Sequence, residues 1–398
     1  MGEDDDTIGF EALKQTLVYW NIDDYPIPVD STDELDAIYG DFLQALDVMG
    51  FRHGYIDVYL YSEQINCEAA VIDYLPQGKS YSAFAYKVPD ITFYMIRHAS
   101  SIGPGPVNYL VIAKPKRELH RVLQCLQSRR HNVLIVKPPP PDEEFLFSLD
   151  SLLENTRFLG GGKPRFKELY AFYGCEYDME HEKYVTVEED LSKIVDFSER
   201  IPTVEGPRTA VFWDAEDFPF PPSSTPDAIY HSISSALEGI GSSDEITIWA
   251  YLDDDKKGTW RDALLGGGKP WASRIYFLPA GDKASRRIRM LNDIYLWKRD
   301  SPYFTSSYEA SLVIFADQFK CSPYYTKMLK TLNDMRYGLL LVTPTLDIYN
   351  PESPEWPALL IDRGAVCFPD QAYINIPEEP SPKTHQADAA SAAEERNS

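Results

Sequence analysis

The chain has 398 residues, with 38 lysines and arginines against 62 aspartates and glutamates, so its formal net charge at pH 7 is −24. This excess of acids opposes a broad basic surface for nucleic acid, although it leaves room for a local basic groove or a metal-bridged contact. Apolar residues make up 44% of the chain, which excludes disorder throughout. The length favours two domains over a single core.

The five cysteines lie far apart and form no C-x-x-C pair, so we expect reduced thiols rather than a disulfide framework or a zinc ribbon. No apolar run approaches the ~18 residues that a membrane span needs. The first six residues are mainly acidic, whereas a signal peptide begins with basic residues. We therefore expect an intracellular protein, most simply a cytoplasmic one, without membrane contact.

An internal repeat organises the chain. Residues 16–28 (TLVYWNIDDYPIP) reappear as residues 209–221 (TAVFWDAEDFPFP), and six of the thirteen positions are identical. Each copy begins with an apolar strand and ends in a proline-rich turn. A repeat of this length predicts two units of the same fold.

The same series of elements follows each copy. Helical spacing of apolar residues and runs of β-branched and aromatic residues predict the helices and strands. In chain order, these are a helix near 35–46, strands 55–61, 109–113 and 132–136, then a helix near 229–237 and strands 245–251, 311–315 and 338–342. Short apolar strands that alternate with helices indicate an α/β fold, a mainly parallel sheet flanked by helices. We expect two such units, at residues 8–140 and 205–372.

Two further segments have a different composition. Four prolines at 138–141 predict a stiff spacer at the start of an acidic linker, residues 141–204. This linker also has apolar runs, so we expect it to be partly ordered, docked on a neighbour and available to protein partners. Residues 373–398 have almost nothing to bury, which predicts a disordered tail.

Acidic residues of the second unit lie beyond the carboxyl ends of its predicted parallel strands, which is where active sites form in such folds. Asp214 ends the first strand of this unit, Asp317 follows the strand 311–315, and Asp293 lies in a helical stretch between them. Three converging carboxylates would repel each other, and a hard cation such as Mg²⁺ or Mn²⁺ would remove the conflict. Such a site is typical of metal-dependent phosphodiester hydrolysis. The alternative is that each aspartate only caps a turn or a helix.

Residues 211–221 resemble the opening strand of the NYN family, a PIN-like ribonuclease fold, and specifically its plant and meiosis-regulator branch. That branch typically has an apolar strand followed by Trp-Asp-x-Glu-Asn-x-Pro-x-Pro. Residues 281–285, 293–297 and 312–344 are similar to later parts of the same family. The resemblance implies two tandem PIN-like (NYN) domains. It also implies an association with peroxisomes or the nucleus and with regulation of gene expression.

By the same resemblance, Asp214, Asp293 and Asp317 occupy the metal-ligand positions for Mg²⁺ or Mn²⁺. Glu216 and Asp217 would lie around them as supporting acids. The family's activity would be endoribonuclease cleavage, with single-stranded RNA as the partner.

The second unit also departs from the family pattern. Asp217 stands where the family usually has asparagine, and Asp317 is a single acid where the family often has two. Arg286 lies near a position where a further acid is common. These differences leave a thinner acidic cluster.

The first unit departs further. Asn21 replaces the aspartate of the first strand, and Lys114 falls where Asp317 lies in the second copy, while Asp90 is retained. Asparagine brings no charge and lysine repels a cation. We expect this unit to bind no metal and to be catalytically inactive.

Basic residues cluster in two places, at 114–121 in the first unit and around Asp293 in the second. Lys283, Arg286, Arg287 and Arg289 would hold an RNA strand near the aspartates. The alternative is that these side chains form solvated helix faces that pair with the acidic linker.

The sequence thus predicts a tandem NYN protein whose second unit is a metal-dependent endoribonuclease. Its alternative is a catalytically inactive RNA-binding or scaffolding protein of the same fold. A third, weaker possibility is a structural module that binds proteins through its linker.

Overall fold

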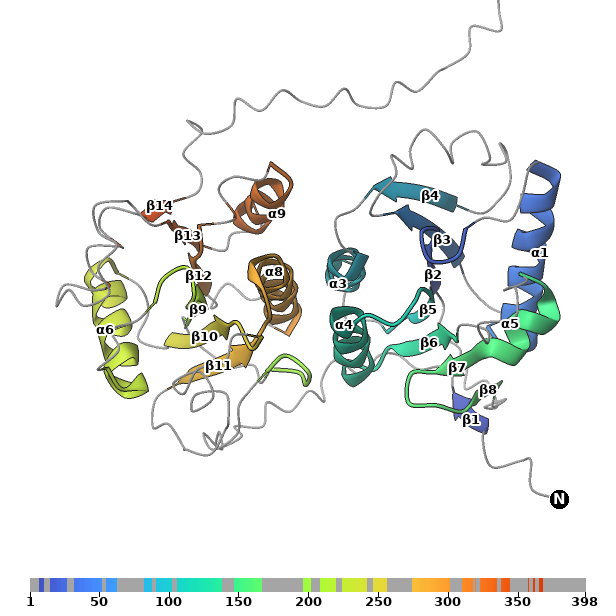
Figure 1. Ribbon diagram of the computed structural model, residues 1–398, viewed down its shortest axis with the longest axis horizontal. Helices are drawn as coiled ribbons and strands as arrows, with labels where there is room; N and C mark the ends of the chain where they lie inside the picture. Colours follow the sequence, from blue (N-terminus) through green and yellow to red (C-terminus); the bar gives the residue numbers. More distant parts are fainter. Residues whose placement is uncertain are drawn as a thin grey trace, which may run out of the picture.

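The structure is a computed structural model (Figure 1). It describes residues 7–10, 15–26, 32–51, 55–62, 82–87, 91–101, 106–137, 147–166, 196–201, 208–219, 224–241, 246–255, 274–300, 310–317, 319, 323–334, 338–343, 357, 361 and 365–367. They form an α/β protein with two mainly parallel sheets, each flanked by helices. In this described part, no helix is long and apolar enough to cross a membrane.

The first unit, residues 15–158, contains a six-stranded sheet in the order β4-β3-β2-β5-β6-β7. Its strands are β2 (Gln15–Asn21), β3 (Tyr55–Ser62), β4 (Ser82–Lys87), β5 (Asn108–Ile112), β6 (Asn132–Val136) and β7 (Thr156–Phe158). Its helices are α1 (Thr32–Val48), α3 (Ile91–Ser101), α4 (Arg117–Ser128) and α5 (Leu149–Asn155). Only β7 is antiparallel to its neighbour.

The second unit, residues 208–367, repeats this topology in the order β11-β10-β9-β12-β13-β14, again with an antiparallel last strand. Its strands are β9 (Arg208–Asp214), β10 (Ile246–Leu252), β11 (Ile275–Pro279), β12 (Ala310–Phe315), β13 (Gly338–Val342) and β14 (Ala365–Cys367). Its helices are α6 (Pro226–Gly239), α8 (Lys283–Asp300) and α9 (Pro323–Asp334). The repeat in the sequence is therefore a repeat of strand order as well.

Local sequence explains how the elements start and which faces they bury. The hydroxyl of Thr225 accepts the N–H of Ala228 at 3.2 Å and caps α6, with proline at the first helical position. In β2, Val18 and Trp20 pack on the α1 side, while the alternate residues face α3 and α4. Both faces of each central strand are buried, as expected for a parallel sheet.

The first sheet extends past the predicted boundary at residue 140. Both α5 and β7 lie beyond it, and β7 pairs with β6 from Leu134↔Phe158 to Val136↔Thr156. A separate two-stranded parallel sheet joins β1 (Thr7–Phe10) to β8 (Lys163–Phe166). Part of the predicted linker therefore completes the first unit.

The two units meet through helices, with α3 and α4 of the first facing α8 of the second (Figure 1). One hydrophobic cluster continues from the first unit into the second. At its centre the rings of Phe93 and Tyr295 pack edge to face, with centroids 4.9 Å apart. Phe197 from the linker is fully buried and packs on Trp249 of β10, with ring centroids 5.0 Å apart.

Candidate functional site

The first strand of each unit ends in the same hydrogen-bonded turn. In the second unit, Oδ1 of Asp214 accepts the backbone N–H groups two and three residues later, at 3.1 and 3.2 Å. In the first unit, Oδ1 of Asn21 accepts the corresponding two N–H groups at 2.9 and 3.4 Å. The turn thus needs one side-chain oxygen, which asparagine supplies as well as aspartate. The turn alone therefore explains why position 214 has a side-chain oxygen at Oδ1.

The guanidinium group of Arg286 is buried against Asp214. Its Nε donates to Oδ1 of Asp214 at 2.9 Å, and its Nη1 donates to the carbonyl oxygen of Gly281 at 3.0 Å. Oδ2 of Asp253 is 3.7 Å from Nη1, and Oδ1 of Asp217 is 3.9 Å from Nη2. Arg286 is 2% exposed and Asp214 is fully buried. Burial raises the pKa of Asp214, and the guanidinium opposes this rise.

Lys283 joins two further acids at the same edge of the sheet. Its Nζ lies 3.1 Å from Oδ1 of Asp217 and 2.7 Å from Oδ1 of Asp317. Burial, the neighbouring carboxyl of Asp317 and the charge of Asp214 raise the pKa of Asp217 to about 7. Partial burial raises the pKa of Asp317, but its contacts with Asp217 and Lys283 outweigh burial and lower it. Of these two neighbouring carboxyl groups, Asp217 therefore has the higher pKa.

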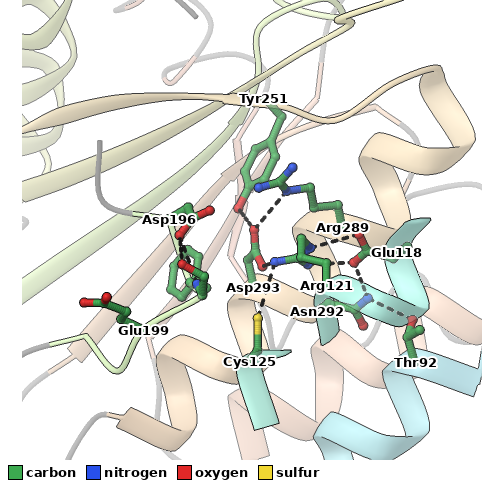
Figure 2. A network of polar contacts seen from close by, with 12 residues as sticks. Thr92, Glu118, Arg121, Cys125, Asp196, Glu199, Tyr251, Arg289, Asn292 and Asp293 are labelled. Carbon is green, nitrogen blue, oxygen red and sulfur yellow. Dashed lines mark hydrogen bonds and ion pairs between the residues drawn. The ribbon is translucent and has the colours of Figure 1, made fainter. Parts of the chain in front are cut away.

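Asp293 has different partners (Figure 2). Its carboxylate is fully buried and accepts from Nη1 of Arg121 at 2.8 Å and from the hydroxyl of Tyr251 at 3.0 Å. Nε of Arg289, one turn earlier on α8, is 3.7 Å away. Arg121 belongs to α4 of the first unit, where it also pairs with Glu118 at 2.6 Å. The carboxylate of Asp293 is thus directed into the contact between the units.

The structure therefore divides the three predicted metal ligands into two groups. Asp214 contacts Arg286 and Asp317 contacts Lys283. Asp217 contacts both basic residues, so Asp214 and Asp317 belong to one cluster. Asp293 lies seven residues after Arg286 on α8, which is about 10 Å along the helix axis. Among the described residues, no group of three or more histidine, cysteine, aspartate or glutamate side chains is arranged to hold a metal ion.

The chemistry of the donors also opposes a divalent cation. Two basic groups, Arg286 and Lys283, already contact four carboxyl groups at the edge of the second sheet. A divalent ion on Asp214 would lie within a few ångströms of a buried guanidinium, where like charges repel strongly. The residues present do not fit the Mg²⁺ or Mn²⁺ site implied by the resemblance. That site remains a prediction from the sequence, without matching ligand geometry in the described residues.

Two of the four predicted RNA-binding residues are buried. Arg286 is 2% and Arg289 is 7% exposed, and their guanidinium groups contact aspartates inside the protein. Arg287 is partly exposed, with its guanidinium 4.4 Å from the ring centroid of Tyr325. Lys283 is half exposed but lies between two acids. Arg286 and Arg289 instead contact carboxylates and backbone carbonyl groups of their own unit, so they do not face an RNA strand.

Other residues of the network were not expected from the sequence. Asp253 directly follows β10, and the strand-end reasoning applied to Asp214 could have found it. Its backbone N–H donates to the carboxylate of Glu216 at 3.3 Å, so Glu216 joins two strand-end loops. No local signal identifies Arg121, because its contact with Asp293 joins residues 172 positions apart.

In the described part of the first unit, a lysine takes the place of one member of the acid pair. The backbone N–H of Lys114 and Nδ2 of Asn21 both donate to Oδ2 of Asp24, each at 2.9 Å. Lys114 follows β5 as Asp317 follows β12. Asp90, the acid expected to be retained in this unit, lies outside the described residues.

Replacing Asp217 by asparagine should stabilise the protein at alkaline pH. The folded-state pKa of about 7 exceeds the ordinary aspartate value of 3.8, so stability falls as pH rises between these values. Asparagine mimics the protonated form, and at pH 8 we expect a gain on the order of 1–3 kcal/mol. Urea unfolding at pH 4, 6 and 8 measures it, with Asp41→Asn on α1 as the control. A variant less stable than wild type at pH 8 would contradict the raised pKa of Asp217.

The chain matches no protein-family model and none of the curated proteins compared with it. The resemblance of residues 211–221 to the NYN family therefore stays a prediction from those motifs. The two mainly parallel sheets are compatible with that resemblance.

Proposed function

We propose that the protein is a catalytically inactive pair of PIN-like units of the NYN type, and that it acts by binding RNA. The observation that carries the loss of catalysis is the buried guanidinium of Arg286, 2.9 Å from Asp214. With Lys283 between Asp217 and Asp317, the protein's own cations stand where a nuclease of this fold would need a metal.

Burial makes it costly for a metal ion to displace Arg286 from Asp214. The side chain of Arg286 is 3% exposed and that of Asp214 is 0% exposed. Removing either partner of a buried ion pair leaves an uncompensated charge, so a metal ion that displaced Arg286 would have to overcome that cost. The pair also supports the turn after β9, because the same oxygen of Asp214 accepts two backbone N–H groups.

The first unit offers the more accessible basic residues for RNA. Lys114, Lys116 and Arg117 are exposed at the carboxyl edge of its sheet. Arg117 also pairs at 2.7 Å with Asp254, which follows β10 in the second unit. This pair brings the basic residues of one unit next to the acidic edge of the other, so an RNA strand would bind mainly on the first unit.

One observation favours a second candidate, a weak metal-dependent endoribonuclease in the second unit. Oδ2 of Asp217 is buried and has no hydrogen-bond partner among the described residues. Burial is the main cause of the raised pKa of this group, and the neighbouring carboxyl groups of Asp317 and Asp214 add to it. Lys283 is half exposed and is the one basic group of this pair with room to move.

Incubation of the full chain with single-stranded RNA in Mg²⁺ or Mn²⁺ distinguishes the two functions. We expect a retarded band in a mobility-shift assay and no cleavage above that of Asp317→Asn, a variant at a partly exposed position. Mn²⁺-dependent cleavage that Asp317→Asn abolishes would establish the second candidate. Failure to bind RNA at low salt would contradict the binding function.

A further inference from the structure

A cavity of about 50 Å³ lies at the carboxyl edge of the first sheet, beside the ends of β2 and β5. One water molecule needs roughly 10–15 Å³, so the cavity has room for a larger polar group. Its polar lining comes from Asn21, Asp24, Thr92, Lys114, Lys116 and Glu118. Among the described residues, two ammonium groups and two carboxylates thus border it, and the partners of the carboxylates decide which charge it attracts.

Both acids of the lining are held by donors from the protein. Oδ2 of Asp24 accepts from Nδ2 of Asn21 and from the backbone N–H of Lys114. Glu118 accepts from Arg121 through both of its oxygens, at 2.6 and 2.9 Å. Burial raises the pKa of Glu118, but the charge and hydrogen bonds of Arg121 outweigh burial and lower it. Arg121 thus offsets the charge of Glu118, whereas the donors to Asp24 are neutral, so two lysines border the cavity beside one carboxylate that is held by uncharged donors.

The basic groups face the solvent side of the cavity. Lys114 and Lys116 are both exposed and line it. Lys116 is also the residue before α4, and its side chain makes no capping hydrogen bond to the helix. The first N–H groups of a helix have no acceptor within the helix, and its dipole adds positive potential at that end. Both features favour an anion at this cavity.

The comparison with the second unit supports this assignment. Lys114 occupies the position that Asp317 has after β12. In the second unit this position helps to hold a lysine ammonium group, with Nζ of Lys283 at 2.7 Å from Asp317. The exchange of aspartate for lysine reverses the charge at the same place in the fold.

We propose that the first unit binds a phosphoryl group in this cavity, held by Lys114, Lys116 and the N-terminal end of α4. The natural ligand would be a phosphate of an RNA backbone. This identity of the ligand rests on the RNA-binding function proposed above. Free inorganic phosphate has the same chemistry, and the experiment separates the two sources.

The test uses the full chain and two probes, inorganic phosphate and single-stranded oligo(U). Calorimetric titration measures phosphate binding, and fluorescence anisotropy measures binding of the labelled RNA. We expect Lys114→Gln and Lys116→Gln each to weaken phosphate binding about tenfold or more, because each removes a charged donor. The matched control is Lys330→Gln, an exposed lysine on α9 of the second unit, which should leave the affinity unchanged.

The outcomes separate this proposal from the proposed function. Weakening of both phosphate and RNA binding by Lys114→Gln would support both. Phosphate binding that depends on Lys114, without RNA binding, would support the cavity and refute RNA as its ligand. RNA binding that neither lysine variant alters would refute the cavity and leave the proposed function standing. Absence of phosphate binding to the wild-type protein would overturn the proposal.

Discussion

Replacing Arg129 by methionine should lower the free energy of unfolding by about 3–5 kcal/mol, because it leaves a buried carboxylate without its counter-ion. Nε and Nη2 of Arg129 donate to the two oxygens of Asp300 at 2.9 and 2.6 Å, and both side chains are almost fully buried. Arg129 follows α4 of the first unit, and Asp300 ends α8 of the second. The pair therefore joins the two units directly.

The linker takes part in the same network. Nη1 of Arg129 donates to the carbonyl oxygen of Phe197 at 3.1 Å, and Nη2 donates to that of Glu199 at 3.2 Å. Asp300 accepts the backbone N–H of Ile201 at 2.9 Å. Loss of Arg129 should therefore also release residues 196–201, which hydrogen exchange would detect as faster exchange there.

Arg130→Met is the matched control for this prediction. Arg130 is the exposed neighbour of Arg129, and substitutions at such positions change stability by about 0.5 kcal/mol or less. Urea unfolding of both variants gives the comparison. Equal stability of the two variants would show that the buried pair does not hold the units together.

Arg121→Met should also destabilise the protein by about 3–5 kcal/mol, because its guanidinium serves two acids at the contact between the units. Nη1 of Arg121 donates to Asp293 at 2.8 Å, and Nε and Nη2 donate to Glu118 at 2.9 and 2.6 Å. Asp293 is fully buried, so the loss cannot be offset by water.

A double-mutant cycle with Asp293→Asn isolates the pair. We expect a coupling energy of about 1–3 kcal/mol between the two positions, as for residues in direct contact. Arg117→Met is the control, because the pair of Arg117 with Asp254 is exposed and should contribute about 1 kcal/mol or less. Additive effects of Arg121→Met and Asp293→Asn would contradict the proposed link.

Much of the fold could be predicted from the sequence, because a segment that occurs twice predicts the same strand and turn in both units. Residues 16–28 and 209–221 each form a strand that ends in the same turn, and Trp20 and Trp213 each donate from Nε1 to the carbonyl oxygen five residues later, at 2.7 and 2.9 Å. The end of the first unit was harder to predict. The short elements α5 and β7 follow a run of prolines, and neither β7 nor its structural counterpart β14 lies in the repeated sequence segments.

The candidate site was only partly predictable. Parallel strands end at a common edge of the sheet, and this rule identified Asp214 and Asp317 from the sequence. Both belong to the cluster around Arg286 and Lys283. The rule could not identify the partner of Asp293, since α8 is buried by helices of the other unit and the pattern along one helix does not name its neighbours. Arg286 and Arg289 are also buried, against carboxylates and carbonyl groups of their own unit, whereas their sequence alone indicated an exposed basic face.

Calorimetric titration of the full chain with Mn²⁺ at pH 7 tests most directly whether Arg286 and Lys283 take the place of a metal ion in the second unit. The wild-type protein should give no saturable heat of binding, and neither should Asp317→Asn. Saturable binding of Mn²⁺ by the wild-type protein, abolished in Asp317→Asn, would contradict the account and restore the carboxylates around Asp214 as a metal site.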